Sequence, residues 1–264
     1  FYNCASLKSV KYLTQNTDNG EYSVESKETS LHPDVKEIPS LLFYGCDVLD
    51  SFIIGSNIES IGSGAFAGCK NSSALKIYGA EEDSLGNIVG EKFSLYKLSD
   101  YSKINKGQYE NYTHYFLTGS DMNNVNVYAY IGGFDADSYT RRGEASTLGK
   151  FSYIDGNVKS IADYAFGNAS FSSIIIRDSV TSLGSNAFNG CKSSDFTIYM
   201  LSQYESYYTT LVGGNMSSKM LDGIDENAEL YIMVPLKISQ SIVDNLSSHL
   251  EGKAEITRWY SSPY

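Results

Sequence analysis

The sequence predicts a solenoid, a mostly β fold in which short, similar units stack along one axis. Three observations lead to this prediction. A motif of constant length occurs four times, beginning at Val35, Ile58, Val158 and Val180. The first two copies start 23 residues apart and the last two 22 residues apart. Each copy is followed by a short run of alternating apolar residues, which is typical of a β-strand.

The motif begins with a β-branched residue, has Ile or Leu at its fourth position and Phe at its ninth. The copies are Val35–Cys46, Ile58–Cys69, Val158–Ala169 and Val180–Cys191, and Phe1–Cys4 matches the last four positions of a fifth. Their spacing is that of leucine-rich repeats, about 20–29 residues. Because one such unit cannot bury its own apolar face, the units must stack, and rows of Phe, Ile and Cys then line the interior.

Each unit is expected to contain a short strand in a parallel sheet and, on the other side, a turn or a short or 3₁₀ helix that carries the Phe. The predicted strands are Leu49–Ile54, Leu75–Tyr78, Ile174–Arg177 and Phe196–Tyr199. We therefore expect one repeat domain over residues 1–264, with repeats near 1–12, 35–54, 58–78, 158–177 and 180–200. Since Phe1 falls in the middle of a repeat, the natural protein is expected to extend further upstream.

Irregular insertions are expected near 13–34, 79–156 and 201–228. The middle one is rich in Tyr, and a structureless segment of that length is improbable inside a compact domain. Extra strands are therefore expected in it, with Lys92–Tyr96 and Asn126–Ile131 as the best candidates.

Residues 229–264 are predicted to form a strand–helix–strand cap, because a solenoid needs its open end covered. An apolar strand ends at Pro235. Apolar residues at helical spacing follow from Ser239, a candidate N-cap, to Leu250. Gly252 ends this helix, and Ala254–Trp259 is predicted as the last strand.

The charge of the chain disfavours two classes of partner. It carries 31 acidic and 20 basic residues, a formal net charge of -11. Such a surface repels nucleic-acid phosphates and anionic lipid headgroups, so neither is expected to bind. No apolar run approaches the roughly 20 residues that span a bilayer, so no membrane insertion is expected in this chain.

The cysteines are predicted to be buried structural thiols. All four occupy the last motif position: Cys4, Cys46, Cys69 and Cys191. A zinc site would need converging ligands with pairs such as Cys-x-x-Cys, which the sequence lacks. A disulfide between Cys46 and Cys69 is the minor alternative, because ladder geometry rarely suits one.

No catalytic, metal or cofactor site is predicted. The three histidines are scattered, and the sequence has no Gly-x-Ser-x-Gly elbow. The acidic cluster from Asp222 to Glu229 lacks the spacing of a calcium loop and is interpreted as a solvated turn. The chain is therefore not expected to be an enzyme.

The candidate binding residues are those that alternate with the core residues of each strand. The residues next to these core residues face outward on the open side of the sheet. The core residues that face inward are Leu75, Ile77, Ile174 and Ile176. The outward-facing residues are Ile53, Lys76, Tyr78, Ile175, Arg177, Thr197 and Tyr199. Exposed Tyr, Ile and Arg side chains resemble the hot spots of protein interfaces. The alternative interpretation is that tyrosine simply suits strands.

The pattern Ile-Gly-x-x-Ala-Phe-x-Gly-Cys, followed by a Leu/Ile strand, resembles the BspA-like leucine-rich-repeat family of bacterial surface proteins. It stands here as Ile61–Cys69 and, with Leu first, as Leu183–Cys191. The copy at 158–169 departs from it by closing with Asn168 and Ala169.

This resemblance implies a non-catalytic, adhesin-like module, extracellular or on the cell surface, that binds host matrix proteins or other bacterial surface proteins through the open sheet face. The alternative is a glycan-binding surface protein that uses the Tyr-rich insertion 79–156, since aromatic rings stack on sugars. A hydrolase built into the insertions is a third hypothesis, which no motif supports.

Overall fold

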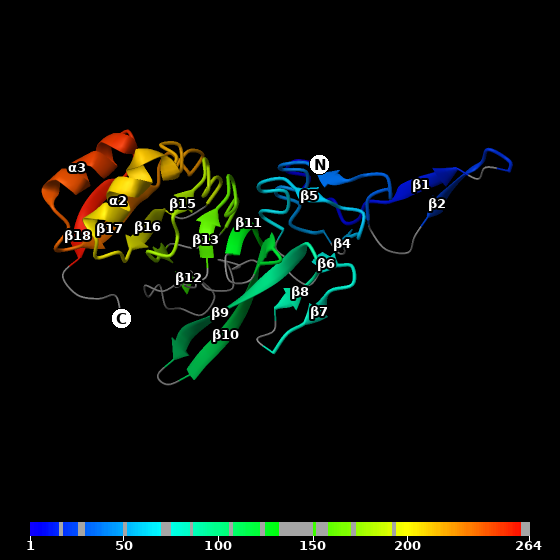
Figure 1. The fold of residues 1–264 in the computed structure, drawn as a ribbon, viewed down its shortest axis with the longest axis horizontal. Helices are drawn as coiled ribbons and strands as arrows, with labels where there is room; N and C mark the ends of the chain where they lie inside the picture. The colour runs from blue at the N-terminus through cyan, green and yellow to red at the C-terminus, as the bar shows by residue number, and fades with distance from the viewer. Residues whose placement is uncertain are drawn as a thin grey trace.

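The computed structural model shows a mostly β solenoid with few helices, as the sequence predicts. It describes residues 1–15, 18–25, 30–49, 52–69, 75–84, 87–105, 108–121, 125–131, 150–151, 158–169, 173–191 and 194–259. The C-terminal cap lies at one end of the long axis and the paired strands at 12–15 and 22–25 lie at the other, and a long hairpin extends from the region between them (Figure 1).

The repeat strands form two rows. The first row comes from the start of each motif: β3 (Glu37–Ile38), β5 (Ser60–Ile61), β13 (Val158–Ile161) and β15 (Ser182–Leu183). The second row follows each motif: β4 (Phe52–Ile54), β6 (Leu75–Ile77), β14 (Ser173–Ile176) and β16 (Asp195–Met200). Equivalent strands of neighbouring units pair in parallel, for example Ile161 with Leu183. The units therefore stack in register.

The motif phenylalanines stack in the interior. The Phe43 and Phe66 ring centroids are 5.2 Å apart, and those of Phe166 and Phe188 are 5.4 Å apart. Backbone bonds join the same turns, since the Phe43 N–H donates to the Ala65 carbonyl at 2.7 Å. The predicted row of Phe is confirmed.

The cysteine row has a repeated hydrogen bond. All four thiols are free, so the alternative of a Cys46–Cys69 disulfide is not realised. The buried thiols donate to the Phe carbonyl of the preceding unit: Cys46 to Phe1 at 3.2 Å, Cys69 to Phe43 at 3.5 Å and Cys191 to Phe166 at 3.5 Å. Cys4 is exposed, contrary to the expectation that all four are buried, because no described turn covers its outer side.

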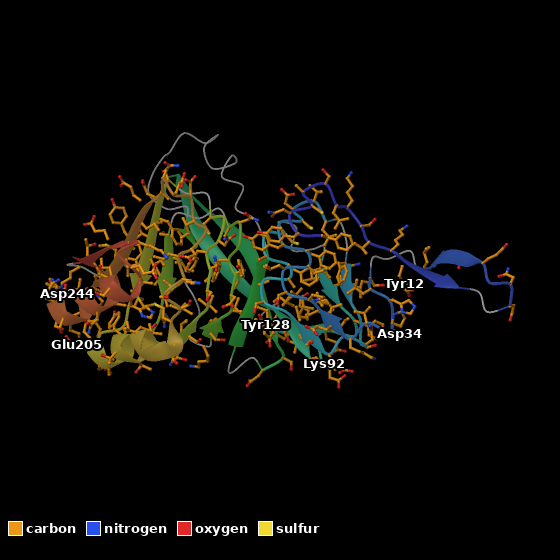
Figure 2. The ribbon with its side chains drawn as sticks, turned by 90° about the horizontal axis from the view of Figure 1, so that it is seen from above. Tyr12, Asp34, Lys92, Tyr128, Glu205 and Asp244 are labelled. Carbon is orange, nitrogen blue, oxygen red and sulfur yellow. The ribbon has the colours of Figure 1, made fainter. Side chains whose placement is uncertain are left out.

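The middle insertion adds strands to the first row. β9 (Phe93–Asn105) and β10 (Gln108–Gly119) form the long antiparallel hairpin, and β11 (Val125–Ile131) returns beside β10. The predicted strand Asn126–Ile131 lies within β11, and the predicted strand Lys92–Tyr96 lies within β9 except for Lys92, which precedes it. β11 also pairs in parallel with β13. The Tyr128 carbonyl accepts from the Gly64 N–H at 3.0 Å, so β11 stands between the units before and after the insertion (Figure 2).

Five further short strands lie in the described part of the chain. They are β1 (Tyr12–Gln15), β2 (Tyr22–Glu25), β7 (Glu81–Glu82), β8 (Ile88–Val89) and β12 (Lys150–Phe151). β1 and β2 form a separate hairpin. The seven-stranded sheet has the order β15-β13-β11-β10-β9-β8-β7, and β12 pairs with β14.

The buried apolar side chains form two clusters, one around Phe66 and one around Phe188. β11 contributes to both, Ala129 to the first and Val125 and Val127 to the second. The insertion thus divides the core of the solenoid into two.

The segment 201–228, expected to be an insertion, contains a further solenoid turn. α2 (Glu205–Thr210) and the helical turn η2 (Leu211–Asn215) precede it. The Ser217 N–H donates to the Leu183 carbonyl at 2.9 Å, and the Gly190 N–H donates to the Gly223 carbonyl at 2.7 Å. Residues 216–224 therefore stack on the preceding motif.

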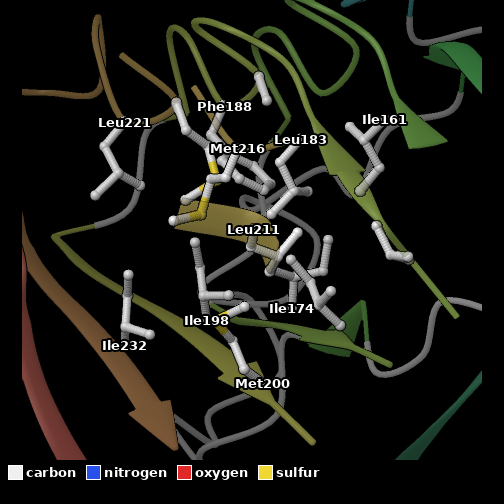
Figure 3. Close-up of a cluster of buried hydrophobic side chains, with 14 of the residues drawn as sticks. Ile161, Ile174, Leu183, Phe188, Ile198, Met200, Leu211, Met216, Leu221 and Ile232 are labelled. Atoms are coloured by element: carbon white, nitrogen blue, oxygen red, sulfur yellow. The ribbon is translucent and has the colours of Figure 1, made fainter. Parts of the chain in front are cut away.

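Apolar residues of other types fill this turn. Met216, which pairs with Leu183, is buried together with Met220, Leu221 and Ile224, at the same spacing as the buried residues Leu183, Ala187, Phe188 and Cys191 one unit earlier. Figure 3 shows Met216 and Leu221 in the same cluster as Leu183 and Phe188. The motif search misses this unit because the apolar character is kept while the residue types change.

The C-terminal cap has the predicted strand–helix–strand order: β17 (Glu229–Pro235), α3 (Gln240–His249) and β18 (Glu255–Trp259). β17 pairs in parallel with β16 and β18 with β17. Ser239 is the N-cap residue, but its hydroxyl makes no bond to the helix. Its N–H donates to the Glu205 carboxylate at 2.8 Å, which ties α3 to α2.

Candidate functional site

The described residues offer surface features and no cluster of metal ligands. Within these ranges, no group of three or more His, Cys, Asp or Glu side chains could hold a metal ion. In the same part of the chain, no helix is both long and apolar enough to cross a bilayer. His249 contacts the Met216 carbonyl at 2.7 Å, and His32 lies 3.5 Å from the Asp34 carboxylate.

The predicted binding residues belong to two different sheets. Lys76 and Ile53 lie on β6 and β4, which form a two-stranded sheet that Tyr78 directly follows. The other four lie on or directly after β14 and β16, in the five-stranded sheet of order β12-β14-β16-β17-β18. Among the described residues, β12 of the insertion pairs with the edge of β14, and β4 and β6 pair only with each other.

The alternation on β14 and β16 follows the expectation, with one difference in exposure. Ile174 and Ile198 lie in the C-terminal core, while Thr197 and Tyr199 are half-exposed on the opposite face. Ile175 also lies outside the core cluster, but only 6% of its surface is exposed. Its strand β14 is flanked by β12 and β16, and Ile175 lies directly beside Tyr199 on β16. Ile175 is therefore not available to a partner in this arrangement.

The cap strands extend this outer face. Tyr231 pairs with Thr197, and Met233 lies between Tyr199 and Thr257. All five side chains are half-exposed, and together we call them the C-terminal sheet face. From the sequence alone, β17 is predicted only as part of a cap. The alternation along this strand carries the same signal as the repeat strands and could have identified Tyr231 and Met233.

One end of the C-terminal sheet face is acidic. The exposed residues Asp195 and Glu229 are paired on β16 and β17, and Glu255 on β18 pairs with Tyr231. The Tyr231 hydroxyl donates to the Glu229 carboxylate at 2.7 Å. That hydrogen bond, and the charges of the surrounding carboxylates, raise the pKa of Tyr231. The face thus combines aromatic and Met side chains with a negative edge.

A separate pocket of about 180 Å³ lies in the N-terminal part, and we call it the Tyr78 pocket. It is lined by Ile54, Gly55, Ser56, Ile58, Ile77, Tyr78, Gly79, Glu91, Lys92 and Phe93. The turns after β4 and β6 and the start of β9 supply these residues. Of the predicted binding residues, only Tyr78 lines this pocket.

The Tyr78 pocket has an apolar floor and a polar rim. Ile58 and Phe93 are buried, whereas Tyr78 is 68% exposed. The Lys92 ammonium, at the surface in Figure 2, donates to the carbonyl oxygens of Ser56 at 3.4 Å and of Ile58 at 3.2 Å. These bonds hold the ammonium at the rim.

Comparison with known proteins identifies the repeat. The family described as BspA type leucine rich repeat region matches in six copies, at residues 1–78, 20–140 and 146–210. A leucine-rich cell surface protein from Faecalibacterium prausnitzii is similar in structure, at 13% sequence identity and a TM-score of 0.36. The match covers 88% of this chain and 60% of that chain. No curated protein matches.

Proposed function

We propose that this chain is a non-catalytic, adhesin-like binding module at a bacterial cell surface. The chain belongs to the BspA-type leucine-rich-repeat family. Membership in this family of surface proteins indicates a module that interacts with other proteins. Its partner is a protein of the host matrix or of another bacterial surface. The observation that carries the proposal is the C-terminal sheet face. Its half-exposed Tyr and Met side chains lie on paired strands beside an acidic edge.

The composition of this face supports protein binding. Tyr and Met are enriched in the cores of protein interfaces, and charged residues are found at their rims. Tyr199, Tyr231 and Met233 lie side by side on paired strands, with Glu229 at the edge. Because parallel hydrogen bonds hold these strands on both sides, the face is preorganised and little conformational entropy is lost on binding.

The alternative from the sequence, a glycan site in the Tyr-rich insertion, involves tyrosines such as Tyr101 and Tyr112. Their side chains lie outside the described residues. We therefore keep protein binding as the proposed function.

Binding of the chain to immobilised matrix proteins, measured by surface plasmon resonance at two salt concentrations, tests the proposal. The double variant Tyr199→Ala/Tyr231→Ala should weaken binding by about tenfold or more, because such anchors contribute over about 1 kcal/mol each. Higher salt should slow association if the acidic edge steers the partner.

The matched control is Tyr204→Ala, because Tyr204 is 67% exposed and lies on the loop before α2, outside the C-terminal sheet face. An equal loss in the control and the double variant would contradict the assignment of the face. Absence of saturable binding to every matrix protein and bacterial surface protein tested would contradict the proposed function itself.

A further inference from the structure

The residues that line the Tyr78 pocket come from three separate segments of the sequence. Two turns of neighbouring repeats, Gly55–Ser56 and Tyr78–Gly79, form one side, and Glu91–Lys92 at the start of β9 form the other. We propose that this pocket binds one neutral sugar ring at the exposed end or side of a glycan. This site is separate from the C-terminal sheet face.

The size of the pocket limits the ligand to one small group. Its volume is about 180 Å³. Pockets that enclose drug-sized ligands have roughly 300–1,000 Å³. The Tyr78 pocket therefore accepts a single ring, and the rest of the ligand must stay outside.

The apolar part of the pocket suits the C–H face of a pyranose. Tyr78 is 68% exposed, a large area for an aromatic residue, and it stands beside the buried floor residues Ile58 and Phe93. A sugar ring lying against Tyr78 would remove apolar surface of both partners from water. The phenolic hydroxyl can remain hydrated at the same time.

The polar rim suits hydroxyl groups. A sugar hydroxyl both donates and accepts hydrogen bonds. The Glu91 carboxylate accepts them, the Lys92 ammonium donates them, and the Ser56 hydroxyl does both. The bonds of Lys92 to the two carbonyls use two of its three N–H groups and hold it in place. The third N–H can serve a ligand at little entropic cost.

Other ligand classes fit less well. An anion would meet the Glu91 carboxylate and a chain of net charge -11. A cation would meet the Lys92 ammonium at the same rim. A purely apolar side chain would displace water from both charged groups without replacing its hydrogen bonds, which is unfavourable. A neutral ring with hydroxyl groups can pack its C–H face against the apolar floor and form hydrogen bonds with both charged groups of the rim.

To test the proposal, the full chain is titrated with methyl glycosides of glucose, galactose, mannose and N-acetylglucosamine, and binding is monitored by ligand-observed NMR. Sialic acid and a sulfated galactoside serve as anionic probes. We expect saturable binding of at least one neutral glycoside. Tyr78→Ala should weaken it by about tenfold or more, while Tyr78→Phe should retain it, because the stacking ring remains. The exposed Tyr204→Ala variant should bind as the unchanged chain does.

Two results would overturn the proposal: no saturable binding of any neutral glycoside, or an equal loss in Tyr78→Ala and Tyr204→Ala. Stronger binding of the anionic probes would overturn the assignment to a neutral ring. The Tyr199→Ala/Tyr231→Ala variant separates this site from the proposed function, because it should lose protein binding and keep sugar binding.

Discussion

Replacing Gly184 with alanine tests how the solenoid turns stack. A Cβ atom at Gly184 would lie 2.4 Å from the Asp163 backbone nitrogen and 2.6 Å from the Ala162 carbonyl carbon. Ordinary contacts of a Cβ atom begin at 3.4 Å. The obstructing atoms belong to the backbone, so they cannot rotate aside as a flexible side chain would. Ala162 occupies the same motif position, but its N–H bonds to β11, at the Val127 carbonyl.

The geometry gives the expected cost. Lengthening the 2.4 Å contact to 3.4 Å requires the two turns to separate by about 1 Å. The Gly184 N–H bond to the Ile161 carbonyl, now 2.9 Å, and the Ser185 N–H bond to the Asp163 carboxylate, now 2.7 Å, would then be lost or weakened. Each contributes about 0.5–1.5 kcal/mol, and overpacking typically costs about 1–3 kcal/mol. Lower entropy of the unfolded chain offsets about 0.4–1 kcal/mol. These ranges combine to a net loss of about 1–5 kcal/mol, and we expect a value near the middle, about 3 kcal/mol.

Urea unfolding followed by circular dichroism measures this loss. Gly213→Ala is the matched control, because a Cβ atom at Gly213 has nothing within 4 Å and its backbone is not in the left-handed region. The control should change the free energy of unfolding by less than about 1 kcal/mol. A Gly184→Ala variant as stable as the control would refute the close-stacking argument.

Three further predictions concern buried groups. Tyr44→Phe removes the hydroxyl that donates to the Asn189 side-chain oxygen at 2.7 Å. It should lower the free energy of unfolding, measured with urea, by about 1–2 kcal/mol. An unchanged urea midpoint would show that this bond does not stabilise the fold. In native protein at pH 8, a thiol reagent should label the exposed Cys4 rapidly. The other three cysteine thiols, whose pKa is raised by burial, should react only when the protein unfolds. Mass spectrometry that finds several rapidly labelled cysteines in the native protein would contradict this burial. Burial also raises the pKa of Tyr207 and Tyr208, so the native state keeps these protons above about pH 10 while the unfolded chain loses them. Stability should therefore fall as pH rises above about 10, and ultraviolet titration that shows all tyrosines ionising together in the folded state would argue against this linkage.

The C-terminal sheet face shows where sequence reasoning about the site ends. Alternation correctly separates Ile174 and Ile198, which are core residues, from Thr197 and Tyr199. It cannot show that Ile175 is covered, because burial on that face depends on which strands lie beside it.

The degenerate turn at 216–224 shows the same limit for the fold. Its buried Met216 and Leu221 replace the Leu and Phe of the motif, so no residue pattern reveals the repeat. Apolar burial accepts many side chains of similar volume, whereas a motif search requires particular ones.

The sequence by itself determined the solenoid, the rows of Phe and Cys and the order of the cap, because these follow from spacing within one unit or between adjacent units. The tertiary structure alone decided that β11 enters the stack, that β6 and β14 lie in different sheets, and that Tyr78 and Lys92 line one pocket. These features arise from contacts between segments joined by long insertions. Local periodicity carries no information about where such segments meet, since the path of an insertion is set by the surfaces against which it packs.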